Sequence, residues 1–213
     1  MNYISIGGWC GTKMALKEFK LFDEPSLPFD SVRSSLEGVI DCINTDFANF
    51  FPQEIKRDER FPKYYAFVGK YIGFYHHNHN LHDVSVIDSF KRKIVRFDEK
   101  VKKGGICFLR TVCKEGELDL YLDLQKALDT KYPGISYIIC FIIPYQIANT
   151  YYKNLDNRTF IFTLHNSYGP IFDMIKNNDL FNNIPVPDLT VELKGMPSDL
   201  WMVDGYPMVG LPV

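Results

Sequence analysis

The sequence predicts an α/β protein: a single three-layer αβα domain over residues 1–213 with a mostly parallel central sheet. Short apolar runs alternate with amphipathic segments along most of the chain, as expected for strands that are joined by helical crossovers. No shift in composition marks a domain boundary. Hydrophobic residues make up 46% of the chain and aromatic residues 15%, which is enough apolar material for a folded core.

Each element rests on its own local pattern. The clearest helix carries Val86, Phe90, Ile94, Phe97 and Val101 at spacings of three and four, with Lys and Arg between them. In chain order the expected elements are a strand at 3–6, a helix at 12–19, a helix at 32–43, a loop with short helical pieces at 46–65, a strand or hairpin at 67–75, a helix at 85–102, a buried strand at 106–112, a helix at 117–128, a strand at 137–143, a helix at 146–152 and a strand at 159–164.

The tail from Asn182 onward is rich in proline and contains Trp201 and Tyr206. We expect this tail to pack over the sheet edge or to close the functional site.

Cys10 is the first candidate for chemistry, because it lies in a Gly-Gly-Trp-Cys-Gly turn between the first strand and the first helix. The helix dipole and free amides at a helix N-terminus favour a thiolate, so we expect a lowered pKa for Cys10. Gly8, Trp9 and Gly11 would line the substrate, and the N–H groups of residues 10–12 would bind an oxyanion. A small buried residue in a tight turn is the structural alternative.

Four of the five histidines lie between His76 and His82, directly after an expected strand. The chain has neither a CxxC pair nor an HExxH motif, so we expect no metal and no cofactor. A solvated polar loop is one interpretation of this segment. The other is that His76 or His77 acts as a general base toward Cys10.

Two further candidates follow strands at the expected sheet edge. Arg110 closes the ICFLR run, where its guanidinium could bind an anion or a carbonyl, although it could also pair with a structural carboxylate. His165 and Asn166 follow the strand at 159–164 and could supply a second base, orient a histidine or cap a helix.

Charge and cysteine content narrow the class of protein. With 24 Lys and Arg against 26 Asp and Glu, the chain has no overall positive charge that would attract nucleic acid. The longest apolar run, residues 135–145, is too short to cross a bilayer, and the N-terminus does not resemble a signal peptide. Five cysteines without paired spacing indicate reduced thiols and a cytoplasmic location, in the host cytoplasm if the protein is viral.

Several motifs resemble, in content and order, a family of bacterial and large-DNA-virus proteins described as putative papain-like cysteine peptidases. The similarity covers roughly the first half of the chain and is carried by the segments SIGGWC, SLPFDS, FYHH, FKRKIVRF and ICFLR. The chain departs from the family pattern at Ser31, where members usually have Trp, and at Lys91, where members usually have Arg.

The resemblance implies a nucleophile at Cys10, with Asp30, His76 and Arg110 at the other motif positions. It also implies a peptide or protein substrate. A papain-like fold would be α+β with an antiparallel barrel, whereas the alternation of elements favours αβα. Asp30 also has a structural explanation, because Asp30 or Ser31 is a suitable N-cap for a helix over 32–43.

These observations predict a cysteine-dependent hydrolase, either a papain-like peptidase or a related acyl hydrolase or transferase, that uses Cys10 with His76 and Asp30. The alternative is a non-catalytic α/β module, in some cases a descendant of an enzyme, that binds a nucleotide, a sugar or a protein. The sequence carries no signal for an oligomeric state.

Overall fold

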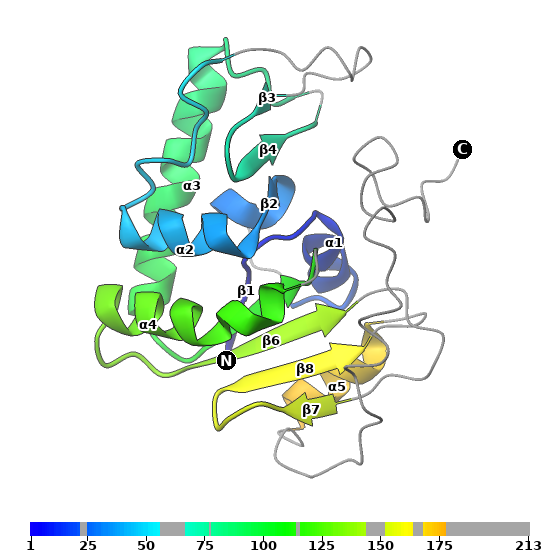
Figure 1. The fold of residues 1–213 in the computed structure, drawn as a ribbon. Coiled ribbons are helices and arrows are strands. Elements are labelled where there is room, and N and C mark those ends of the chain that lie inside the picture. The colour runs from blue at the N-terminus through cyan, green and yellow to red at the C-terminus, as the bar shows by residue number, and fades with distance from the viewer. Residues whose placement is uncertain are drawn as a thin grey trace.

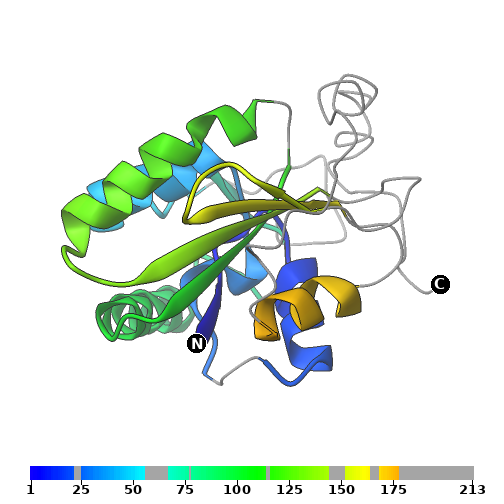
Figure 2. The ribbon, with the colours of Figure 1, turned by 90° about the horizontal axis from the view of Figure 1, so that it is seen from below.

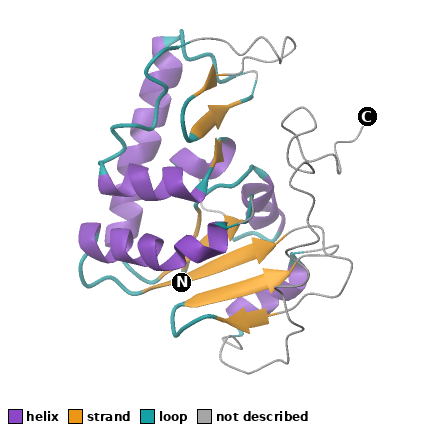
Figure 3. Ribbon diagram, in the orientation of Figure 1, coloured by secondary structure: helices purple, strands orange, loops and turns teal. Residues whose placement is uncertain are grey.

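A computed structural model of the chain describes residues 1–21, 25–55, 67–76, 78–113, 116–143, 152–163 and 168–177. Figures 1 and 3 show the elements that these residues form. The helices are α1 (Gly11–Glu18), α2 (Leu36–Asn44), α3 (Val84–Lys102), α4 (Tyr121–Lys131) and α5 (Gly169–Lys176), with 3-10 helices η1 (Pro28–Ser31) and η2 (Glu117–Leu120). The strands are β1 (Asn2–Ser5), β2 (Arg33–Ser34), β3 (Phe67–Val68), β4 (Ile72–Phe74), β5 (Ile106–Thr111), β6 (Tyr137–Ile143), β7 (Tyr152–Asn154) and β8 (Thr159–Thr163).

The main sheet has the order β1-β5-β6-β8-β7. The first four strands in this order are parallel, and β7 joins β8 antiparallel at the edge. This confirms the predicted α/β class with a mostly parallel sheet, and the described residues contain no antiparallel barrel of the papain-like alternative. None of the helices in the described ranges is long and apolar enough to cross a membrane.

Helices cover both faces of this sheet, as Figure 2 shows in the view from below. On one face, α1 and α5 bury residues such as Leu16 and Phe172 against alternate residues of β5, β6 and β8. On the other face, α2, α3 and α4 bury residues such as Val39, Phe97 and Leu128. The two-residue period of the strands therefore sends alternate side chains into two separate cores.

A small antiparallel sheet, of order β2-β4-β3, lies beyond the main sheet (Figure 1). Arg33 of β2 is opposite Gly73 of β4, and the β3–β4 hairpin closes where Gly69 N–H donates to Ile72 O at 2.8 Å. Phe74 packs edge to face against Phe90 of α3, with 5.2 Å between ring centroids. The predicted hairpin around residue 69 is confirmed, whereas the separate sheet was not predicted.

The predicted helix over 32–43 is wrong at its start. Residues 28–31 form η1, residues 33–34 pair with β4, and α2 begins at Leu36, so neither Asp30 nor Ser31 caps it. Ser35 is the cap, because its hydroxyl accepts from the N–H of Gly38 at 3.2 Å. Strand pairing with β4 overrides the helix-forming pattern just before Ser35.

Other helices also differ from expectation. The helix expected at 117–128 starts as η2 and ends as α4 at residue 131, and α5 was not predicted. The helix expected at 146–152 is wrong at residue 152, which lies in β7, while residues 144–151 fall outside the described residues. The tail from residue 182 also falls outside them.

Candidate functional site

Cys10 lies at the N-cap of α1, directly after the turn that follows β1. Parallel strands end at the same edge of a sheet, and Figure 1 shows α1 on the side of the β6 and β8 arrowheads. The side chain is partly exposed, and the N–H of Met14 donates to Cys10 O at 3.0 Å in the first turn of the helix. The predicted position of Cys10 between strand and helix is confirmed.

The turn before Cys10 requires two glycines. Gly7 and Gly8 have φ angles of +84° and +88°, which favour glycine over all other residues. A Cβ on Gly8 would lie 2.3 Å from Thr111 O, so the backbone of the turn touches the end of β5. Gly11 serves a different contact, since its missing Cβ leaves room for the Trp9 ring. Gly8 and Gly11, which were predicted to line the substrate, are therefore required by the backbone of the turn itself.

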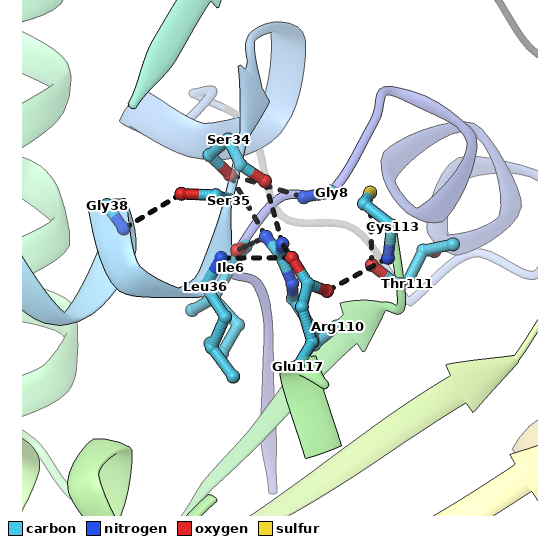
Figure 4. A network of polar contacts seen from close by, with 10 residues as sticks. All are labelled: Ile6, Gly8, Ser34, Ser35, Leu36, Gly38, Arg110, Thr111, Cys113 and Glu117. Atoms are coloured by element: carbon cyan, nitrogen blue, oxygen red, sulfur yellow. Dashed lines mark hydrogen bonds and ion pairs between the residues drawn. The ribbon is translucent and has the colours of Figure 1, made fainter. Parts of the chain in front are cut away.

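Arg110 holds this turn from inside the protein, as Figure 4 shows. Its Nη1 donates to Ile6 O at 3.1 Å and to Ser34 Oγ at 3.0 Å, and its Nη2 donates to Ser34 O at 2.7 Å. Ser34 Oγ in turn accepts from the N–H of Gly8 at 3.2 Å. The Gly8 amide is therefore engaged by Ser34.

Glu117 neutralises this buried guanidinium. Its Oε1 lies 2.6 Å from Arg110 Nη2 and also accepts from Leu36 N–H at 3.0 Å, while Oε2 accepts from Cys113 N–H at 2.9 Å. Arg110 and Glu117 are both fully buried. Arg110 therefore pairs with a structural carboxylate, one of the two alternatives that the sequence left open, and does not present its guanidinium at the surface.

A second anchor holds the other side of Cys10. Thr12 Oγ1 lies 2.5 Å from Thr111 Oγ1, and both threonines are fully buried. Cys10 is thus flanked two residues before by the Gly8–Ser34 contact and two residues after by the Thr12–Thr111 contact. The two contacts fix the backbone that presents the thiol.

Asp30 is fully buried in η1, next to α1. Its Oδ2 accepts from Leu27 N–H at 2.6 Å, and no donor among the described residues reaches Oδ1. Burial raises the pKa of this carboxyl from 3.8 to about 6, against the opposing charges of Lys13, Lys93 and Lys100. Asp30 therefore caps its own 3-10 turn, and within the described part of the chain its side chain hydrogen-bonds to the backbone of Leu27 and not to a histidine.

The histidine segment turns back toward η1. Ser31 Oγ lies 3.4 Å from His79 Nε2, and His79 is buried against the rings of Phe74 and Phe90. The His76 ring centroid is 5.0 Å from that of His79, and the His79 N–H donates to His76 O. The structure thus brings the segment that carries His76 beside Asp30 and Ser31. His79 holds this segment in place through its contacts with Ser31 and with the backbone of His76.

The pKa of the Cys10 thiol is raised, mainly by burial. A hydrogen bond to its own backbone and the charges of Arg33 and Lys13 oppose this rise. The lowered pKa expected from the helix N-terminus is therefore wrong for the protein as it stands, because desolvation outweighs these contributions.

Three predicted site residues, His77, His165 and Asn166, lie outside the described residues. Within the described ranges, no group of three or more His, Cys, Asp or Glu side chains could hold a metal ion. All five cysteines are free thiols.

Ser34, Glu117 and His79 were not predicted as site residues. No motif or spacing links Glu117 to Arg110 or Ser34 to Gly8, since these pairs meet only through the fold. One signal was present for Arg110: a strand of a parallel sheet is covered on both faces, so an arginine within it needs a buried partner.

The fold and this site define a class of protein: an α/β protein with a cysteine at the head of the helix that follows its first strand. The model of the family described as "Putative papain-like cysteine peptidase" matches residues 1–146, and the chain belongs to this family. The matched region contains β1, the turn, Cys10 and the whole Arg110 network. No curated protein and no solved structure matches the chain.

Proposed function

We propose that the chain is a cysteine-dependent hydrolase, a peptidase or a related acyl hydrolase or transferase, with Cys10 as its nucleophile. One observation carries the proposal: within the region that matches the family, Cys10 lies at the N-cap of α1 and is held by anchors on both sides. Such fixed placement of a nucleophile is the main structural requirement of covalent catalysis.

The proposed reaction has two steps. His76 takes the thiol proton while the sulfur attacks the carbonyl carbon of the substrate, the bond to the leaving amine breaks, and the amine departs with the proton. Water then attacks the thioester, which releases the acid and restores the thiol. The N–H groups of the first turn of α1 support the oxyanion in both steps.

His76 is assigned as the base because it follows β4 in the segment that lies beside Asp30 and Ser31. His77 is the alternative base. Asp30 accepts a hydrogen bond from the backbone N–H of Leu27. Asp30 therefore acts on the site by its charge and by shaping η1, and not as a hydrogen-bonded partner of His76.

Iodoacetamide labelling of each cysteine, followed by peptide mass spectrometry over a range of pH, tests the proposal. Cys10 is expected to label about tenfold faster than the partly exposed Cys113 at pH 7, and His76→Ala is expected to slow the labelling of Cys10 several-fold. His82→Ala, which removes an exposed histidine of the same segment, is the matched control. Equal labelling of Cys10 in the wild type and in His76→Ala would contradict the assignment.

The raised pKa of Cys10 favours a second candidate, a module that binds its ligand at this edge without a covalent step. If Cys10 labels no faster than Cys113 at any pH between 6 and 9, this binding module is the better description.

A further inference from the structure

His79 is a buried histidine that side chains from three elements enclose. It is 3% exposed, and its ring packs edge to face against Phe74 of β4 and Phe90 of α3, with 6.1 and 5.1 Å between ring centroids. From η1, Ser31 Oγ lies 3.4 Å from His79 Nε2. Two aromatic contacts and one polar contact leave the imidazole little room to turn. The ring of His79 is therefore held in one position.

His76 is tied to this ring at two places. The N–H of His79 donates to His76 O at 2.8 Å, which fixes the backbone of the proposed base. The two imidazole rings also meet edge to face, with 5.0 Å between their centroids and 74° between their planes. The backbone bond alone would not restrict the rotamer of His76. The ring contact restricts it, because a change of rotamer would break that contact.

The chain that precedes His76 is anchored on the same side chain. Phe74, two residues earlier, is fully buried and packs against Phe90, with 5.2 Å between ring centroids, as well as against His79. His76 itself is partly exposed. The segment therefore presents one partly exposed imidazole between two buried anchors. This arrangement suits a proton acceptor, which must reach the reacting atoms and yet keep its orientation.

A series of contacts connects this segment with the helix of Cys10. Ser31 belongs to η1, and η1 lies against both α1 and α3. Helix α1 carries Cys10 at its N-cap. The 3-10 turn therefore contacts both the helix that carries the proposed nucleophile and the segment that carries the proposed base.

We propose that His79 is a positioning residue, which holds the imidazole of His76 in the orientation that accepts the proton of Cys10. This inference rests on the function proposed above, in which His76 is the base. His79 acts through His76 and does not touch the substrate, since its own side chain is buried.

A double-mutant cycle tests the proposal, with the rate of Cys10 labelling by iodoacetamide at pH 7 as the readout. His79→Ala is expected to slow the labelling about threefold, because a loosened base spends less time in the productive orientation. In the His76→Ala background, His79→Ala is expected to have no further effect, because a positioning residue acts only through the residue that it positions. An unchanged rate in His79→Ala overturns the proposal, and so do effects of the two replacements that multiply.

Three further variants separate the position of the ring from its acid–base chemistry. His79→Phe keeps an aromatic ring against His76 and is expected to label within about twofold of the wild type. A His79→Phe as slow as His76→Ala would assign the proton transfer to His79 and overturn the proposal. Ser31→Ala loosens the same ring without opening a cavity, so the cycle can be repeated with it if His79→Ala does not fold. His82→Ala, which changes an exposed histidine of the same segment, is expected to leave the rate unchanged.

NMR relaxation of protein labelled with 13C in its histidine rings follows the His76 ring directly. His79→Ala is expected to make this ring more mobile, whereas His79→Phe is expected to leave its mobility unchanged. Equal mobility in the wild type and in His79→Ala overturns the proposal. Failure of the hydrolase assignment gives a different result: His76→Ala then does not slow the labelling of Cys10, although His79→Ala still mobilises the His76 ring.

Discussion

Replacement of Glu117 by glutamine tests the buried ion pair beneath the Cys10 turn. Glu117 accepts three hydrogen bonds, from Arg110, Leu36 and Cys113, at 2.6, 3.0 and 2.9 Å. Glutamine has nearly the same shape, but its amide nitrogen would face a donor and the Arg110 charge would remain unpaired. Loss of one partner of a buried pair costs about 3–5 kcal/mol, so Glu117→Gln is expected to lower the free energy of unfolding by that amount.

The assay is urea-induced unfolding at pH 7, followed by far-ultraviolet circular dichroism. Asp129→Asn is the matched control, because Asp129 pairs with Arg158 at 2.9 Å while the two side chains are 48% and 34% exposed. An exposed pair contributes less than about 1 kcal/mol. Equal losses in Glu117→Gln and Asp129→Asn would refute the reasoning.

Three further predictions concern the same region. The folded pKa of Asp30, about 6, lies above 3.8, so the protonated form is favoured in the folded state and stability falls as the pH rises between these values. Relative to Asp30→Asn, wild-type unfolding free energy is expected to drop by about 3 kcal/mol between pH 3.5 and pH 7, and parallel curves would contradict this. Gly134→Ala is expected to lower the free energy of thermal unfolding by about 1 kcal/mol, and Gly8→Ala is expected to lower it by a larger amount. Both glycines have positive φ angles, but only a Cβ on Gly8 would meet a carbonyl oxygen. Ser34→Ala is expected to slow iodoacetamide labelling of Cys10, whereas Ser35→Ala, which removes a helix cap, lowers stability without that effect.

Much of the main sheet could be predicted from the sequence, because each parallel strand is a short apolar run bounded by glycines or polar residues. The strand at 137–143 coincides with β6. The small sheet could not be predicted, since β2 and β3 are two residues each and exist only through their pairing with β4. Local pattern carries no information about such non-local pairs.

The candidate site divides in the same way. The placement of Cys10 follows from a local motif, a strand, a glycine turn and a helix, and the structure agrees with it. The buried role of Arg110 depends on Glu117 and Ser34, which are distant in sequence or lie in another element. The raised pKa of Cys10 depends on burial by the whole fold, and a sequence motif at a helix N-terminus does not report burial.

The pairing of β1 has a consequence for the order in which the protein folds during synthesis. In the described sheet β1 lies at the edge and pairs with β5, so Asn2 meets Ile106 about a hundred residues later. The Arg110 network closes only once Glu117 has been made. A nascent chain that stops before β5 therefore carries an unpaired N-terminal strand, and one that stops before η2 still lacks the Glu117 that closes the Arg110 network beneath the glycine turn. The thiol of Cys10 gains its fixed surroundings late in translation.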